Sequence, residues 1–390
     1  MRDSFLPFAR PDVDEASIED VCDSIRSGWL TTGPKTMKFE KEFAEKVEAT
    51  HAMAVSSATS GLHLAFLALG IGPGDEVITT PMTFVATVNA AIWTGAKPVL
   101  ADIDSKTLNV RPELMEKLVN ERTKALVPVH FAGRPCDMDP IEDLASRHGL
   151  AVVEDAAHGL GAFYRGRPIG SDRGARRCSV FSFHPTKNIT TGEGGMVCTS
   201  DEDLAERISV LRQHGMSKGA WNRYAAKGTP HYDVLFPGYK ANMMDIQAAI
   251  GRGQLRSLDQ FNRRRREIVA KYMTELSDQP GLILPQPQSD DTLHSWHIFT
   301  PFVDVDVLDI DRDGFMAAMR ELNIGTALHY QALHLFSHYR DRYGWKRGDF
   351  QEAEYASDRI VSLPLFPAMS DADVDDVVKG VRSVLRSHLK

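Results

Sequence analysis

The chain has 390 residues and a formal net charge of −8 at pH 7, with 43% hydrophobic and 25% charged residues. This composition is ordinary for a folded globular protein, and the length suggests two domains. The acidic balance argues against nucleic acid or an anionic membrane as the main partner, and no apolar run has the length of a membrane span.

The N-terminal residues and the cysteines both favour a cytoplasmic protein. Residues 1–5 contain no apolar stretch of the kind found in a secretory signal. The cysteines are scattered, and no pair has CxxC spacing; they are Cys22, Cys136, Cys178 and Cys198. We therefore expect neither a disulfide nor a metal site.

Helical and strand patterns alternate through the first half of the chain. Helical spacing over 14–27 and 38–49 is separated by a break at 27–34. Strands are then expected at 52–56, 76–80, 98–101, 125–129 and 151–154, with helices at 59–69, 84–94, 112–120 and 138–148. Strands that alternate with helices of this length predict βαβ units and a mainly parallel sheet.

The second half of the pattern is more varied. Two further strands, at 178–183 and 196–199, should join the sheet, and a long polar loop is expected at 216–237. The remaining expected elements are helices at 201–215, 242–276, 312–322 and 371–387, and strands at 296–303 and 324–329. The long helix would connect a large α/β domain, residues 1–260, to a smaller α+β domain, residues 261–390.

Lys187 is the first candidate for chemistry. It lies on a short Gly-rich excursion between the two apolar strands that flank it. Burial near apolar walls disfavours the ammonium form and lowers the pKa of a lysine, which makes it a candidate nucleophile for a Schiff base. Taken alone, an exposed loop lysine is the commoner outcome.

Three other features follow predicted strands. Small hydroxyl residues at 56–61 open a helix, where free N–H groups can hold an anion, although a plain N-cap is an alternative. Asp155 ends a buried strand and could partner the ring nitrogen of pyridoxal phosphate, or form a structural salt bridge. His158 and Phe84 could contact a ring or simply pack in the core. Together these features predict a site for pyridoxal phosphate at the carboxyl edge of the sheet.

At these residues the chain resembles the DegT/DnrJ/EryC1/StrS family of sugar aminotransferases. The resemblance runs from residues 5–8 to 363–367. It rests on the motifs at 27–34, 154–158 and around Lys187. It implies a homodimer of fold type I, similar to aspartate aminotransferase, with pyridoxal 5'-phosphate as cofactor.

The resemblance also implies roles for individual residues. Lys187 would bind the cofactor covalently and act as the catalytic residue. Asp155 would pair with the ring nitrogen, His158 would lie near the phenolic oxygen, and Phe84 would stack on the ring. The phosphate would be held by Ala58, Thr59 and Ser182, with Lys240 or Asn242 reaching it from the other subunit. The positions expected on the substrate side are Thr31, Thr32, His329 and Tyr330.

Within the family, the chain looks most similar to the aminotransferases that form UDP-4-amino-4-deoxy-L-arabinose. This similarity implies that glutamate donates its amino group to the C4 keto group of a UDP-linked sugar, giving 2-oxoglutarate. UDP-4-keto-pentose is the leading substrate, with lipid A modification or another lipopolysaccharide or polysaccharide pathway as the setting. UDP-4-keto-6-deoxyhexoses, with or without a 2-acetamido group, are alternatives, because the stretches 171–177 and 216–237 differ from the arabinose enzyme.

Other activities are disfavoured by particular residues. Related enzymes that deoxygenate sugars replace the lysine with histidine, so Lys187 favours transamination. A non-catalytic sensor on the same fold is an alternative, but no DNA-binding motif or basic extension is attached. A nucleotide-dependent dehydrogenase is disfavoured because no GxGxxG follows the first strand.

Overall fold

The computed structural model describes residues 2–217, 231–288 and 291–390. A central sheet of seven strands has the order β1-β9-β8-β5-β4-β2-β3. All neighbouring pairs within it are parallel except those made by β9. The strands are β1 (His51–Val55), β2 (Glu76–Thr79), β3 (Lys97–Leu100), β4 (Thr123–Leu126), β5 (Ala151–Asp155), β8 (Arg177–Ser182) and β9 (Gly195–Thr199). The predicted mainly parallel sheet is confirmed.

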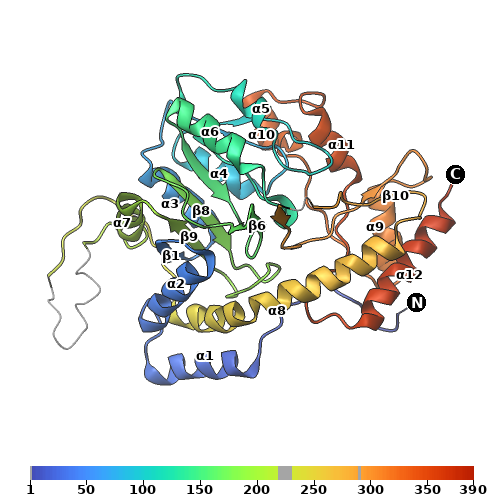
Figure 1. Ribbon diagram of the computed structural model, residues 1–390, viewed down its shortest axis with the longest axis horizontal. Coiled ribbons are helices and arrows are strands. Elements are labelled where there is room, and N and C mark those ends of the chain that lie inside the picture. Colours follow the sequence, from blue (N-terminus) through green and yellow to red (C-terminus); the bar gives the residue numbers. More distant parts are fainter. Residues whose placement is uncertain (1, 218–230, 289–290) are drawn as a thin grey trace.

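Helices cover both faces of this sheet (Figure 1). Alternate residues of a strand point to opposite faces, so Val152 of β5 packs in one core and Val153 in the other. One face is covered by α3 (Ala58–Ala68), α4 (Val85–Trp93) and α7 (Glu202–Leu211). The other is covered by α2 (Pro34–Val47), α6 (Met138–His148) and the first half of α8 (Asp245–Glu275). Burial on both faces explains why these strands read as continuous apolar runs.

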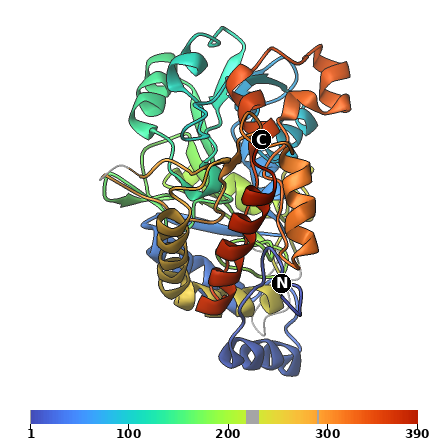
Figure 2. The same ribbon diagram turned by 90° about the vertical axis from the view of Figure 1, so that its right-hand side faces the viewer.

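Helix α8 joins two hydrophobic cores. Leu258 and Phe261 belong to the core under the sheet, whereas Ile268 and Tyr272 belong to a second core. Figures 1 and 2 show α12 (Asp371–Ser387) beside the C-terminal part of α8. The second core also contains α9 (Arg312–Glu321) and the two-stranded sheet of β10 (Leu282–Ile283) and β12 (Phe302–Val303). The division into 1–260 and 261–390 stays a proposal; its boundary lies inside α8.

The remaining elements are short or peripheral. The helices are α1 (Glu15–Ser27), α5 (Pro112–Glu116), α10 (Ser337–Tyr343) and α11 (Gln351–Arg359), with 3-10 turns η1 (Phe131–Gly133) and η3 (Leu333–Leu335). The strands β6 (Phe163–Tyr164), β7 (Arg167–Pro168) and β11 (Thr292–Leu293) form a small separate sheet. In the part of the chain that the structure describes, no helix is both long and apolar enough to cross a membrane.

Two predicted strands of the C-terminal part are wrong. Of residues 296–303, only the last two form a strand; the range begins with Trp296 at a φ of +48°, and Phe299 forms only an isolated bridge with Leu363. Residues 324–329 form only isolated bridges, Leu6 with Ile324 and Ala327 with Ser362. Helices α10 and α11 were not predicted. The predicted loop at 216–237 lies mostly outside the described residues.

Candidate active site

One cavity of about 390 Å³ lies at the carboxyl ends of the parallel strands. Its walls come from the ends of β5 and β8, from the starts of α3 and α4, and from the segment that precedes η3. Nine of the predicted site residues line it: Ala58, Thr59, Phe84, Asp155, His158, Ser182, Lys187, His329 and Tyr330. The strand order explains this meeting, since ligands of open α/β sheets bind at this edge.

Lys187 lies in the loop between β8 and β9, as the sequence predicts. Its backbone N–H donates to the carbonyl of His184 at 2.9 Å, which closes a tight turn. The side chain is half-buried and lines the cavity. Removal of the amine from water lowers the pKa of Lys187 to about 8, an effect that the charge of Asp155 partly opposes. A substantial fraction of this amine is therefore neutral near physiological pH.

Asp155 is the buried last residue of β5, and two donors fix its carboxylate. Thr87 donates its hydroxyl to Oδ2 at 2.7 Å, and the backbone N–H of Ala157 donates to Oδ1 at 3.1 Å. Thr83 lies 2.8 Å from the Thr87 hydroxyl and continues the chain of hydrogen bonds. Hydrogen bonds to a carboxylate favour its charged form. Thr87 was not predicted as a site residue; it lies in the first turn of α4 and carries no motif of its own.

The start of α3 offers free N–H groups to the cavity. Ser57 caps the helix by accepting from the backbone N–H of Ser60 at 3.1 Å. The amides of Ala58 and Thr59 have no hydrogen-bond partner among the described residues, as is usual in a first helical turn. Gly195 lets β9 approach closely, since a Cβ there would lie 2.6 Å from the Ala58 nitrogen. This arrangement suits an anion.

Phe84 is not a core residue. Its side chain is 56% exposed although it precedes an otherwise apolar helix. Its ring centroid lies 6.1 Å from that of Tyr330, on the wall of the cavity. An exposed aromatic ring in this position leaves one face open to a planar ligand.

His158 is held as a neutral imidazole. Its Nδ1 accepts from the backbone N–H of Ala132 at 3.2 Å, so this nitrogen carries no proton. The proton therefore lies on Nε2 and is donated to the hydroxyl oxygen of Tyr330, 3.0 Å away. Burial lowers the pKa of His158 well below its ordinary value, which agrees with the neutral form. The O–H of Tyr330 remains free to donate to another acceptor.

His329 lies beside Tyr330 at the same wall. Its Nδ1 is 2.9 Å from the Ser362 hydroxyl. Burial, with a smaller contribution from the charge of Lys187, lowers the pKa of His329 to about 3. This histidine is therefore a neutral polar group at neutral pH.

The comparisons with known proteins agree with this geometry. The profile of the DegT/DnrJ/EryC1/StrS aminotransferase family matches residues 11–382. The chain belongs to this family.

Similar proteins cover nearly the whole chain. The spore coat polysaccharide biosynthesis protein SpsC of Bacillus subtilis (strain 168) is 50% identical over 386 residues, which are 99% of this chain and 98% of SpsC. The solved structure of DesV from S. venezuelae is 36% identical, with a TM-score of 0.87, over 98% of this chain and 99% of DesV. Spr1654 of Streptococcus pneumoniae, in its PMP form, is 31% identical with a TM-score of 0.91 over 98% of this chain and 99% of its own.

The family and its solved members establish the chemical class. The chain is a pyridoxal-phosphate-dependent aminotransferase of fold type I. The cavity of this family member fits the cofactor at three separated points. It has an amine of lowered pKa, a buried carboxylate held by two donors, and free helix N–H groups beside Gly195.

Four of the predicted site residues lie away from this cavity. Asn242 donates its amide N–H to the hydroxyl of Thr32 at 2.6 Å, and Thr32 donates to the carbonyl of Met243 at 2.6 Å. Thr31, which precedes Thr32, is exposed, and so is Lys240, which lies two residues before Asn242. The side-chain oxygen of Asn242 is buried and has no partner among the described residues. Within one chain these residues form a separate cluster.

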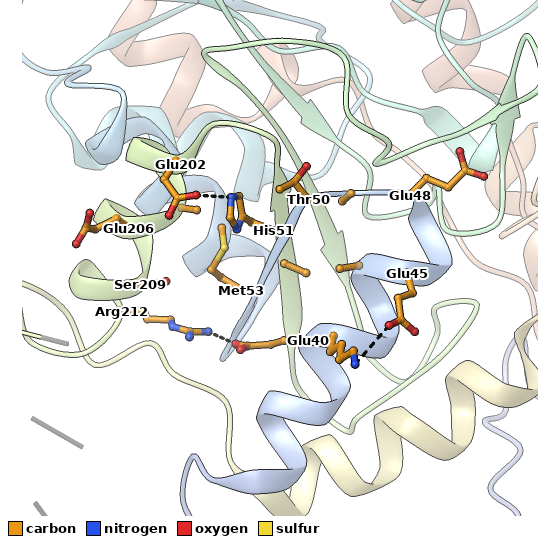
Figure 3. Close-up of a pocket in the computed structure, with 15 residues that line it drawn as sticks. Glu40, Glu45, Glu48, Thr50, His51, Met53, Glu202, Glu206, Ser209 and Arg212 are labelled. Atoms are coloured by element: carbon orange, nitrogen blue, oxygen red, sulfur yellow. Dashed lines mark hydrogen bonds and ion pairs between the residues drawn. The ribbon is translucent and has the colours of Figure 1, made fainter. Parts of the chain in front are cut away.

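A second, more open hollow of about 570 Å³ contains none of the predicted site residues (Figure 3). Figure 3 shows Glu202 directed at His51 and Glu40 directed at Arg212 across it. The carboxylates that line this hollow outnumber its lysine and arginine, so it is an acidic surface. The hollow lies at the edge strand β1, away from the carboxyl ends where Lys187 and Asp155 meet.

Proposed function

We propose that this aminotransferase transfers the amino group of glutamate to the C4 keto group of a UDP-linked sugar. The observation that carries the reaction type is the pairing of Lys187 and Asp155 in one cavity, with the pKa of Lys187 lowered to about 8. Support for a sugar acceptor comes from the similarity to SpsC, a spore coat polysaccharide biosynthesis protein. UDP-4-keto-pentose of the arabinose type is the leading acceptor.

The residues of the cavity have separate tasks in this proposal. Pyridoxal phosphate, when bound, supplies a conjugated ring that accepts the electrons released as a Cα–H bond breaks. Asp155, oriented by Thr87, would hold the protonated ring nitrogen. Ala58, Thr59 and Ser182 would hold the phosphate.

Lys187 performs the proton transfers. Its neutral amine would hold the cofactor and, when free, would take the Cα proton of the donor as a general base. The same side chain, then protonated, would act as the general acid, and it would exchange these two roles when the sugar is the reactant. A pKa near 8 suits both directions because neither protonation state is strongly disfavoured.

The remaining side chains of the cavity would contact the cofactor ring and the sugar. Phe84 would stack on the cofactor ring, and His158 would lie near its phenolic oxygen. His329 and Tyr330 would contact the sugar on the opposite side, as neutral hydrogen-bonding groups. UDP-4-keto-6-deoxyhexoses, with or without a 2-acetamido group, are the alternative acceptors. The cytoplasmic location and the lipid A or lipopolysaccharide setting stay predictions.

We further propose a homodimer whose sites use residues of both subunits. The cluster of Thr31, Thr32, Lys240 and Asn242 lies outside its own cavity, and several side chains close to it along the chain are apolar and exposed. These are Trp29, Leu30, Met37, Val234, Leu235, Tyr239 and Met244. An exposed apolar patch of this kind is typical of an interface. Lys240 or Asn242 would reach the phosphate in the partner's cavity, with Thr31 and Thr32 near its substrate.

The acceptor can be identified by isotope transfer. The purified enzyme is incubated with ¹⁵N-glutamate and, separately, UDP-4-keto-pentose, UDP-4-keto-6-deoxyglucose and its 2-acetamido counterpart. Mass spectrometry of the products should show ¹⁵N in the pentose derivative first and fastest. Preferred labelling of a hexose would move the proposal to the alternative acceptor, and no labelling of any UDP sugar would refute it.

A further inference from the structure

Another cavity, of about 290 Å³, lies behind the wall of the active site and is distinct from the open hollow at β1. Its apolar lining includes Leu108, Phe131, Leu284 and Phe302. Phe131 belongs to both regions, because its ring also lies 6.3 Å from His158 and 6.1 Å from Tyr330, measured between centroids. This back cavity has the size and apolar character of a small-molecule site.

The charges of the back cavity all have one sign. Its charged lining consists of Lys106 and Arg134, and no carboxylate is among the described residues that line it. Arg134 donates to the carbonyls of Gln286 and Pro287 but has no carboxylate within 4 Å in the described ranges. Burial lowers the pKa of Arg134, with Asp104 as the carboxylate whose charge acts on it. The charged side chains that line this cavity are thus both cations, although the adjoining groove that they share also contains carboxylates such as Asp104; inside the cavity this lining favours an anionic ligand.

Residues 294–297 separate the back cavity from the active site and present a different face to each. His294 and Trp296 line the back cavity, where their rings stack with centroids 3.8 Å apart. Ser295 and His297 face the other way. The Ser295 hydroxyl donates to the carbonyl of His158 at 2.8 Å, and the His297 ring lies 4.3 Å from the His158 ring.

This segment is also tied to Lys187 and to the turn that holds His158. The carbonyl of Ser295 accepts from the side chain of Asn188, the neighbour of Lys187, at 3.1 Å. The N–H of His297 donates to the carbonyl of Ala132 at 2.9 Å, and the N–H of Ala132 fixes the tautomer of His158. A movement of His294 or Trp296 would therefore change the positions of groups on both sides of the catalytic cavity.

We propose that the back cavity binds a small hydrophobic anion, such as an aromatic carboxylate, and that this binding changes the active site through residues 294–297. The aromatic part would lie against Phe131 and Phe302. The carboxylate would accept hydrogen bonds from Arg134 and Lys106 at the opening. The ligand would act as a regulator, because residues 294–297 separate this cavity from the one that contains Lys187 and Asp155.

Calorimetry with 2-naphthoate tests the binding. The neutral isostere 2-naphthamide serves as the matched control ligand, and both are titrated into the holoenzyme. We expect 2-naphthoate to bind with a dissociation constant of about 1 mM or lower. The amide should bind about tenfold more weakly, because it loses the charge-assisted hydrogen bonds. Equal binding of the two ligands, or no binding of 2-naphthoate, would overturn the proposal.

Two variants locate the ligand. Arg134→Met removes the cation, and Leu284→Trp fills the back cavity. Each should weaken 2-naphthoate binding about tenfold or more. Arg111→Met is the control, because Arg111 lies in a neighbouring groove and pairs with Glu113. Unchanged binding in both variants would overturn the assignment to this cavity.

A comparison of two forms of the enzyme tests whether binding in the back cavity affects the active site. The affinity of 2-naphthoate is compared between holoenzyme and enzyme freed of pyridoxal phosphate. If residues 294–297 transmit the effect, the two dissociation constants should differ by about fivefold or more, and the affinity for pyridoxal phosphate must change by the same factor. Equal constants would show that the back cavity does not act on the active site. None of these measurements depends on the identity of the sugar.

Discussion

Lys187, Asp155 and His158 lie within one cavity, yet their surroundings differ in kind. Lys187 loses solvent without gaining a close carboxylate partner, so its pKa falls. Asp155 is also buried, but two hydrogen-bond donors stabilise its charge. His158 is kept neutral because a backbone N–H occupies its Nδ1. The chain thus provides a deprotonable amine, a fixed anion and a fixed neutral donor next to one another.

The pH dependence of cofactor capture tests the environment of Lys187. Only the neutral amine attacks a carbonyl, and half of it is neutral at a pH of about 8 instead of the ordinary 10.5. The rate at which the cofactor-free enzyme binds pyridoxal phosphate covalently should rise about tenfold per pH unit below this value and level off above it.

Stopped-flow absorbance measures this rate. A free lysine derivative is the control, and its rate should keep rising to a pH of about 10. A protein rate that parallels the control would contradict the lowered pKa.

Thr87 should matter for the cofactor although it cannot reach the reacting atoms. Thr87→Val keeps the shape of the side chain but removes the hydrogen bond to Asp155 Oδ2, so the carboxylate is less firmly oriented toward a ring nitrogen. We expect turnover to fall about tenfold or more, with weaker binding of pyridoxal phosphate.

Thr94→Val is the matched control for this variant. Thr94 is a buried threonine at the other end of α4; its hydroxyl donates to the carbonyl of Ala91 and accepts from the backbone N–H of Ala96, so it has no side-chain partner there. If the two variants had equal turnover and cofactor affinity, Thr87 would have only a structural role.

At the scale of elements, the site depends on how closely β9 packs against the start of α3. Gly195→Ala would place a methyl group 2.6 Å from the Ala58 nitrogen, so one of the two elements must move. We expect weaker binding of pyridoxal phosphate and a loss of about 1–3 kcal/mol in the free energy of unfolding.

Equilibrium titration with the cofactor and denaturant unfolding measure the two effects. Gly72→Ala is the control, since its nearest contact would be an ordinary 3.8 Å from the carbonyl of Thr94. Unchanged cofactor affinity in Gly195→Ala would separate this contact from the phosphate site.

The elements also show what could be predicted from the sequence. Strand β5 and the β8–β9 pair have apolar runs that end in Asp155 or border Lys187, so both the strands and the cavity edge were predictable. The link between His158 and Tyr330 spans 172 positions, and the hydrogen bond from Thr87 to Asp155 spans 68. Such contacts depend on tertiary packing and leave no local pattern. The expected strand at 296–303 also meets distant parts of the chain: the N–H of His297 donates to the carbonyl of Ala132, a contact that the local sequence does not indicate.

At the scale of the whole molecule, complementation tests the shared sites of the proposed dimer. Lys187→Ala removes the catalytic amine, and the double variant Lys240→Ala/Asn242→Ala removes the residues proposed to cross the interface. Each variant alone should have little activity. Subunits mixed by mild unfolding and refolding should regain about a quarter of wild-type activity. About half of the dimers formed by random pairing are mixed, and each mixed dimer contains one intact site of two.

Light scattering gives the accompanying mass, which should be twice that of one chain. A monomeric mass would contradict the dimer. A dimer that regains no activity on mixing would contradict the placement of Lys240 and Asn242 in the partner's cavity.

The absorption spectrum of the purified protein, before and after addition of glutamate, tests the central claim most directly. The wild-type enzyme with pyridoxal phosphate should show a visible band that moves to the near ultraviolet with glutamate and returns with the keto-sugar. Lys187→Ala should bind the cofactor without forming the covalent band or completing this cycle. A wild-type spectrum that does not respond to glutamate would contradict the proposed donor. A Lys187→Ala variant with normal turnover would contradict the assignment of Lys187 as the catalytic residue.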